Sequence, residues 1–229
     1  MVETPSGPSA VPGTMTIMTA PERPETPSPR TLLFIGDSIT DCGRREDPDA
    51  LGHGYVRLLA EHFAAHEPTA TVLNRGIGGD KVADLEARFS ADCLAHGPDL
   101  VTIYVGVNDA WHRYTRGEHV DDADFERAYR HLLDQLAATV PGAPVLLIVP
   151  FVADIDAQTA LIHEDLDRKV AIIRRLAAAH GHRLVDLEQM LATALKAGHT
   201  PRSIAEDGVH PTAAGHRLIA DAWLDAAGR

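Results

Sequence analysis

Cysteine is scarce in this chain of 229 residues, which contains only Cys42 and Cys93. Two cysteines cannot build the disulfide framework of a small secreted protein, and they fit a reducing, cytoplasmic compartment best. Long apolar runs are missing as well. Because no segment approaches the roughly 20 apolar residues that a membrane-spanning helix needs, we expect a soluble protein that does not act in a membrane.

Basic and aromatic residues are also few. Lys and Arg number 21 against 33 Asp and Glu, which gives a formal net charge of −12 at pH 7. An acidic surface repels phosphate backbones and anionic lipids, so the composition argues against nucleic-acid binding. With only five Phe and two Trp, the chain also has little material for an apolar patch that would bind a lipid surface.

The composition fits a globular protein, with 45% hydrophobic and 24% charged residues. A chain of this length buries about 70% of its unfolded surface and needs no disulfide or metal to hold its core. Its first thirty residues contain seven prolines and no signal-peptide pattern. We therefore expect a disordered proline-rich tail over residues 1–29 and a single domain over residues 30–229.

Apolar segments alternate with amphipathic ones along this domain. Strands are predicted at 31–36, 70–76, 99–107, 143–150 and 182–187. Helices are predicted at 54–66, 81–95, 122–139, 156–180, 188–197 and 212–227. Strands that are apolar throughout and separated by helices indicate a parallel sheet covered on both faces. The predicted fold class is α/β, a three-layer α/β/α sandwich with a five-stranded parallel sheet.

Polar clusters follow the first three strands. Asp37 and Ser38 follow the first strand, residues 74–80 the second, and Asn108 and Asp109 the third. Ligands of parallel sheets bind outside the carboxyl ends of the strands, so we expect these clusters to meet at one edge.

Ser38 can be a helix cap, a turn residue or a nucleophile. A nucleophilic serine needs a base within hydrogen-bond reach and donors for the oxyanion. The elbow motif G-x-S-x-G of ordinary α/β-hydrolases would place glycine at position 40, where this chain has Thr40. That class of hydrolase is therefore disfavoured.

The glycine-rich stretch 74–80 allows three interpretations. It can form a phosphate cradle, a tight turn, or a backbone N–H aimed at a developing negative charge. The dinucleotide pattern G-x-G-x-x-G would require glycine at position 81, where Lys81 stands, and no suitable acidic residue follows to bind a ribose. Nucleotide binding is therefore disfavoured.

Two further pairs bear on catalysis. Asn108 and Asp109 suit a turn, although the Asn108 amide can also donate a hydrogen bond into the cleft. Asp207 and His210 suit a capping loop, but their spacing also lets the carboxylate hold one imidazole nitrogen while the other faces the cleft.

One pair of histidines suggests a metal. His62 and His66 lie four residues apart on a predicted helix, but neither a following glutamate nor a third ligand is evident. With thirteen histidines in the chain, chance explains the pair. We expect no metal and no cofactor.

Together these motifs resemble the SGNH (GDSL-type) hydrolase family over nearly all of residues 31–228. The four blocks correspond to Gly36-Asp37-Ser38, Asn74 to Gly79, Gly106-x-Asn108-Asp109 and Asp207-x-x-His210. The family's fold is flavodoxin-like, which agrees with the predicted sheet.

The resemblance implies a catalytic triad and an oxyanion hole. Ser38 would be the nucleophile, His210 the general base, and Asp207 the residue that orients His210. The oxyanion donors would be the backbone N–H groups of Ser38 and Gly79 and the side-chain amide of Asn108, with Gly78 as an alternative to Gly79.

A closer likeness links "IGDSITDCGRR", "GVNDAWHRY" and "DGVHPTAAGHRLIADAWL" to the SGNH esterases that deacetylate xylan and xylo-oligosaccharides. It implies an acyl-enzyme mechanism on short esters, and a small acyl ester or acetylated oligosaccharide as the partner, with a homo-oligomer left open. Candidate substrate contacts are Trp111, Arg44 and Asp37, although the position of Asp37 also suits fixing the turn backbone. The alternatives are a lipid acylhydrolase of the same family and a non-catalytic module that binds acetylated sugars.

Overall fold

The structure of the protein, a computed structural model, describes residues 1–2 and 30–229. Its centre is a five-stranded sheet whose paired strands all run parallel. The strands are β1 (Thr31–Gly36), β2 (Thr71–Gly76), β3 (Leu100–Tyr104), β4 (Val145–Val149) and β5 (Arg183–Asp186). Their order is β2-β1-β3-β4-β5, so the chain extends the sheet to one side of β1 and then to the other. The carboxyl ends of β1 and β3 form the switch point where such sheets bind ligands.

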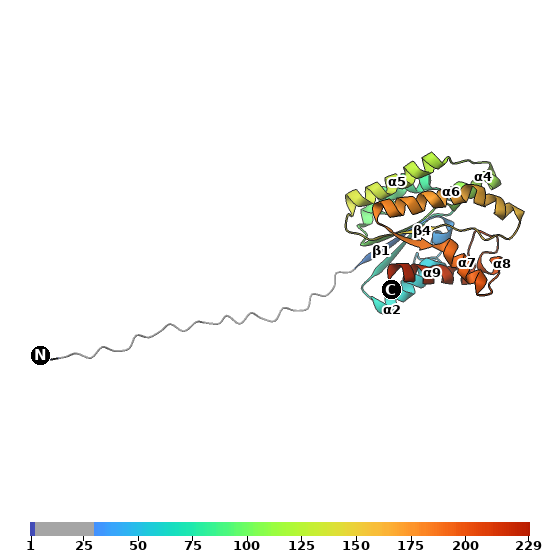
Figure 1. Cartoon of the computed structure of the whole chain (residues 1–229). Helices are drawn as coiled ribbons and strands as arrows, with labels where there is room; N and C mark the ends of the chain where they lie inside the picture. The colour runs from blue at the N-terminus through green and yellow to red at the C-terminus, as the bar shows by residue number, and fades with distance from the viewer. Residues whose placement is uncertain (3–29) are drawn as a thin grey trace.

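Helices cover both faces of the sheet (Figure 1). One layer consists of α3 (Val82–Asp92), α4 (Val107–Arg116), α5 (Asp122–Thr139) and α6 (Ala157–His180). The other consists of α2 (Tyr55–His66), α7 (Leu187–Lys196), α8 (Pro201–Ile204) and α9 (Ala213–Ala227). The one-turn helix α1 (Ser38–Asp41) follows β1, and the 3₁₀ helix η1 (Leu94–His96) follows α3. The predicted three-layer α/β/α sandwich is confirmed.

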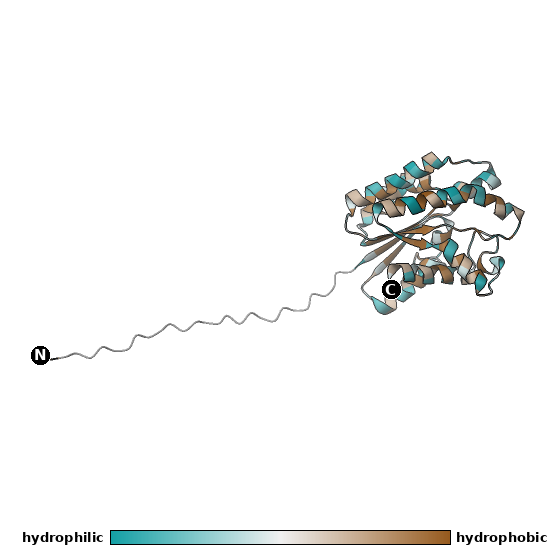
Figure 2. Ribbon diagram, in the orientation of Figure 1, coloured by the Kyte–Doolittle hydropathy of each residue, from teal (hydrophilic) through white to brown (hydrophobic). Residues whose placement is uncertain are grey.

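The middle of the sheet explains why its strands are almost entirely apolar. Every residue of β3 and β4 is buried, because helices exclude water from both faces, and the hydropathy colouring shows the same apolar interior (Figure 2). Within β3, the hydroxyl of Thr102 accepts a hydrogen bond of 2.9 Å from the indole N–H of Trp223 on α9. That bond satisfies both buried polar groups at the contact between sheet and helix.

The third strand is shorter than the predicted 99–107. It ends at Tyr104, and α4 begins at Val107, so Asn108 and Asp109 lie in the first turn of a helix. Gly106 makes the change of direction with φ of +128°, and a Cβ there would lie 3.2 Å from the ring of Phe125. The β-branched run favoured a longer strand, but tertiary packing at this glycine ends it.

The other predicted strands and helices are present, with boundaries shifted by at most three residues. The sequence did not predict α1, α4, α8 or η1. The expected tail over residues 1–29 lies almost wholly outside the described residues. Within residues 30–229, none of the helices is long and apolar enough to cross a membrane.

Candidate active site

Ser38 is the first residue of α1 and follows β1 almost directly. The residue before it, Asp37, caps this helix, because its carboxylate accepts a hydrogen bond of 3.0 Å from the N–H of Ile39. The chain therefore leaves the sheet and enters a helix within two residues. This turn places Ser38, which is partly exposed, at the carboxyl edge of the sheet.

His210 lies beside Ser38, although 172 positions separate them in the sequence. Its Nε2 atom is 2.9 Å from Ser38 Oγ, and its Nδ1 atom is 2.7 Å from Asp207 Oδ2. The other oxygen of Asp207 accepts backbone N–H bonds from His210 at 2.7 Å and Val209 at 2.9 Å. The structure thus joins the three predicted triad residues in one chain of hydrogen bonds.

These contacts determine the tautomer of His210. A carboxylate only accepts hydrogen bonds, so Nδ1 carries the hydrogen and Nε2 presents its lone pair to the Ser38 hydroxyl. Burial raises the pKa of Asp207, but hydrogen bonds from the His210 ring and from the N–H groups of His210 and Val209 outweigh it and lower the pKa below its usual value. Asp207 is therefore ionised at neutral pH and can stabilise an imidazolium ion.

Three N–H groups can receive a negatively charged oxygen. Within residues 30–229, the backbone N–H groups of Ser38 and Gly79 have no hydrogen-bond acceptor. The N–H of Gly78, by contrast, donates to Asp41 Oδ2 at 3.0 Å. Asn108 Nδ2 donates one hydrogen to the Asp80 carbonyl at 3.0 Å and keeps a second one. Of the two glycines that the sequence left open, the geometry favours Gly79.

Asn108 and Asp109 also hold the loop that carries Gly79. While Asn108 binds the carbonyl of Asp80, the Asp109 carboxylate accepts the N–H of Val82 at 3.1 Å. Asp109 is completely buried, which raises its pKa to about 7 even though the Val82 N–H opposes the shift. Two neighbouring side chains of α4 therefore fix the loop on both sides of residue 81.

Asp37 does not lie where a substrate could contact it, so the structure corrects that expectation. Its side chain is completely buried beneath the site. Burial raises its pKa to about 7, the Ile39 N–H opposes this, and the nearby Asp109 adds to it. Asp37 fixes the turn before Ser38, which is the second role that its position suggested.

The other two candidate substrate residues differ from each other. The Trp111 ring is partly exposed and meets the His210 ring edge-on, with centroids 5.5 Å apart and planes at 70°. Trp111 and Asp207 also line a hollow of about 280 Å³ beside the triad. Arg44 is only 13% exposed, and its Nε donates to the Gly76 carbonyl at 2.6 Å. Trp111 is thus placed at the rim, whereas Arg44 is bound to the backbone rather than free for substrate.

His216 and Cys42 form a second pair of a histidine and a potential nucleophile near the site. The Nδ1 atom of His216 accepts the N–H of Tyr55 at 3.2 Å, so its hydrogen must sit on Nε2, which is 3.4 Å from Cys42 Sγ. Burial lowers the pKa of His216 to about 4, and His210 adds to the effect. Burial also raises the pKa of the Cys42 thiol. His216 therefore cannot accept a proton from Cys42 at Nε2.

Sequence reasoning missed the side chains that tie the loops together. Arg88 on α3 donates to the carbonyl of Gly36 at 3.0 Å, the carbonyl of Arg75 at 2.8 Å and the carboxylate of Asp80 at 2.7 Å. One guanidinium thereby joins the ends of β1 and β2 to the glycine loop, residues 77–81, which connects β2 to α3. No local pattern marks such a residue, because its partners come from three different segments.

The histidine pair on α2 is held by ordinary helix contacts. The rings of His62 and His66 stack with centroids 4.3 Å apart, and His66 Nδ1 lies 2.8 Å from the His62 carbonyl. Across residues 30–229, no group of three or more His, Cys, Asp or Glu side chains is arranged to hold a metal ion.

Known proteins resemble this chain over most of its length. Residues 34–218 match the model of the GDSL-like lipase/acylhydrolase family. The chain is 35% identical over 204 residues to an acetylxylan esterase from Geobacillus stearothermophilus. The aligned region covers 84% of this chain and 91% of that protein. The crystal structure of Axe2, an acetylxylan esterase from the same organism, matches with a TM-score of 0.79 and 34% identity, covering 88% of this chain and 95% of that one.

A third match comes from a different source. LAE5, an α/β hydrolase enzyme from the metagenome of Lake Arreo in Spain, has a TM-score of 0.78 and 34% identity, covering 87% of this chain and 95% of its own. Crystal structures of Axe2 with a serine or an aspartate replaced by alanine are described as catalytic mutants. The family match and the identity over most of both chains agree with the fold and with the motifs. The chain is therefore a carboxylic ester hydrolase and belongs to the GDSL-like lipase/acylhydrolase family.

Proposed function

We propose that this protein removes acetyl groups from carbohydrates such as xylo-oligosaccharides, through an acyl-enzyme formed on Ser38. The observation that carries this proposal is the hydrogen-bonded chain from Asp207 through His210 to Ser38, with contacts of 2.7 and 2.9 Å. The relationship to acetylxylan esterases supports acetyl as the acyl group and a sugar as the alcohol.

The first half of the reaction forms the acyl-enzyme. His210 Nε2 takes the proton of the Ser38 hydroxyl while Oγ attacks the ester carbonyl carbon. Negative charge then moves to the carbonyl oxygen, where the N–H groups of Ser38 and Gly79 and the amide of Asn108 receive it. Loss of one such donor typically lowers the rate about 10²–10³-fold.

The second half releases acetate. The tetrahedral intermediate collapses, and the sugar alkoxide leaves with the proton that His210 had accepted. Water then gives a proton to the same Nε2 atom and attacks the acyl carbon, and collapse of the second intermediate returns this proton to Ser38 Oγ. Throughout, Asp207 keeps the hydrogen of His210 on Nδ1, so Nε2 faces the reacting atoms.

The surroundings of the triad support a sugar as the leaving group. The partly exposed indole of Trp111 stands at the rim of the site, next to His210. Arg202 and Gln158 line the same hollow of about 280 Å³ and offer hydrogen-bond donors. An aromatic ring with polar groups around it suits a sugar, which has both apolar C–H faces and hydroxyl edges.

The test compares substrates and variants in parallel. Turnover of 4-nitrophenyl esters from acetate to octanoate is measured together with acetate release from acetylated xylo-oligosaccharide. The enzymes are wild type, Ser38→Ala and, as a matched control, Ser90→Ala, which changes an exposed serine on α3. We expect fast acetate turnover, acetate release from the sugar, no activity above background for Ser38→Ala, and an unchanged control.

Each other result points to a specific alternative. Turnover that rises toward octanoate, with no release from the sugar, would favour a lipid acylhydrolase. Activity in neither assay would favour a module that binds acetylated sugars without cleaving them. A Ser38→Ala variant that keeps its hydrolysis rate would rule out the serine mechanism.

A further inference from the structure

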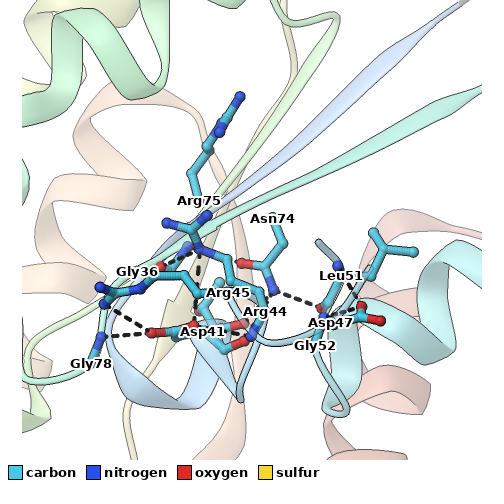
Figure 3. Close-up of polar contacts among 12 residues, drawn as sticks. Gly36, Asp41, Arg44, Arg45, Asp47, Leu51, Gly52, Asn74, Arg75 and Gly78 are labelled. Carbon is cyan, nitrogen blue, oxygen red and sulfur yellow. Dashed lines mark hydrogen bonds and ion pairs between the residues drawn. The ribbon is translucent and has the colours of Figure 1, made fainter. Parts of the chain in front are cut away.

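Asp41 connects the helix of the nucleophile to the glycine loop. It is the last residue of α1, three positions after Ser38, and its Oδ2 atom accepts the N–H of Gly78 at 3.0 Å (Figure 3). A Cβ on Gly78 would lie 3.8 Å from the Cβ of Ser38, so the loop passes directly beside the nucleophile. The bonded N–H of Gly78 immediately precedes the unbonded N–H of Gly79.

The backbones of the same two segments are also in close contact. Asn74 Nδ2 donates to the carbonyl of Thr40 at 2.6 Å. It also donates to the carbonyl of Leu51 at 2.8 Å (Figure 3). At Gly76, a Cβ would lie only 2.1 Å from the backbone nitrogen of Asp41, so no side chain fits there. The end of β2 is therefore packed closely against α1, which fixes the position of the first residue of the glycine loop.

Both carboxylate oxygens of Asp41 already have partners. Oδ2, which accepts the N–H of Gly78, also lies 3.5 Å from the guanidinium of Arg45. Oδ1 accepts the N–H of Arg44 at 3.2 Å. The Asp41 side chain is only 13% exposed. A carboxylate held in this way is poorly placed to take a proton from substrate, but it is well placed to orient the backbone.

We propose that Asp41 is a positioning residue of the oxyanion hole, which holds the N–H of Gly78 so that the N–H of Gly79 faces the developing oxyanion. The two N–H groups belong to consecutive residues, so fixing one restricts the peptide that carries the other. The inference rests on the Ser38 mechanism proposed above. It extends that mechanism to a residue that never touches substrate.

The experiment separates positioning from simple stabilisation of the fold. Asp41→Ala removes both acceptors. Asp41→Asn keeps one carbonyl oxygen, but its NH₂ group cannot accept the second N–H. The control Asp186→Ala removes a carboxylate with the same types of contact, the N–H of Gln189 at 3.1 Å and the guanidinium of Arg174 at 2.7 Å, at the edge strand β5.

Three quantities are measured for each folded variant: kcat and KM for 4-nitrophenyl acetate, and the inhibition constant of methylboronic acid. The boronate forms a tetrahedral adduct with a serine oxygen and so reports the oxyanion hole directly. For Asp41→Ala we expect kcat to fall about 10–100-fold and boronate affinity to fall in proportion, with KM within about threefold of wild type. Asp41→Asn should lie between this variant and wild type, and Asp186→Ala should keep wild-type kcat and boronate affinity.

The proposal is overturned if Asp41→Ala folds and keeps wild-type kcat, or if kcat falls while boronate affinity does not. Should Asp41→Ala fail to fold, Asp41→Asn decides by the same two measurements. A failure of the underlying mechanism looks different, because it would appear as activity that survives in Ser38→Ala.

Discussion

His210 and His216 each lie next to a potential nucleophile, but their rings carry the hydrogen on different nitrogen atoms. Each ring has a nucleophilic atom near Nε2, the Ser38 hydroxyl at 2.9 Å for His210 and the Cys42 thiol at 3.4 Å for His216. The difference lies at Nδ1, where His210 donates to the Asp207 carboxylate and His216 accepts the N–H of Tyr55. His210 therefore presents a lone pair to its nucleophile, whereas His216 presents a hydrogen.

Exposure separates the two rings further. His210 is partly exposed, whereas His216 is buried and has a pKa lowered to about 4 by that burial. A histidine within hydrogen-bond distance of a nucleophilic atom is thus not by itself a general base. The group on the far nitrogen and the access to solvent decide which of the two pairs can react.

The largest expected difference is between the two nucleophilic atoms. Ser38→Ala should lower kcat for acetyl esters by about 10⁴–10⁶-fold, because only the oxyanion donors and binding remain. Cys42→Ala should keep nearly wild-type kcat, because His216 cannot take the thiol proton. Steady-state assays with 4-nitrophenyl acetate check both, and a large loss in Cys42→Ala would show that the second pair contributes to the reaction.

The same substitution at the two histidines should separate activity from stability. His210→Asn should lower kcat by about 10⁴-fold or more. His216→Asn keeps an acceptor for the Tyr55 N–H and should retain nearly wild-type kcat, with a loss of about 1 kcal/mol in the free energy of unfolding. Enzyme assays and urea denaturation of both variants test this, and equal losses of kcat would contradict the distinction between the rings.

Asp207→Asn should make the contacts of His210 resemble those of His216. The N–H groups of Val209 and His210 hold one oxygen of Asp207, so the amide of asparagine would turn its NH₂ group toward Nδ1. The hydrogen of His210 would then move to Nε2, and we expect kcat to fall about 10²–10⁴-fold with little change in KM. A variant that keeps wild-type kcat would show that the tautomer is not controlled from position 207.

The smallest effect concerns stability and pH. The pKa of His216 is about 4 in the folded protein against an ordinary value of 6.5, so the unfolded chain binds more protons between these pH values. The contribution of His216 to stability is thus fully present above pH 6.5 and is lost as the pH falls toward 4. Asp37 and Asp109 have pKa values raised to about 7, so their contribution to stability increases as the pH falls over much of this range.

A difference measurement removes the contribution of these two carboxyl groups. The free energy of unfolding of wild type minus that of His216→Asn should decrease by about 1–2 kcal/mol from pH 7 to pH 5. Urea denaturation at several pH values measures it. Parallel curves for the two proteins would show that His216 titrates as it does in the unfolded chain.

The parts of the fold that depend on local pattern were predictable from the sequence. Helix α5 begins and ends where its periodicity predicted, at Asp122 and Thr139. The end of β3 was not predictable in this way, because Val105 and Val107 have strand propensity while the conformation of Gly106 and its packing against Phe125 start a helix instead. Local propensity yields where tertiary contacts compete with it.

The sequence by itself determined the parallel sheet, the edge at which the polar clusters meet, and the residue types that suit an ester hydrolase. It could do so because burial on both faces leaves an apolar pattern along the chain, parallel strands bring their carboxyl ends to one edge, and the motifs there resemble a known family. Only the tertiary structure decided which glycine N–H is free, that Asp37 is buried, and that Asp41 holds Gly78. Each of these depends on partners from segments far apart in the sequence, and no local pattern specifies which donor meets which acceptor.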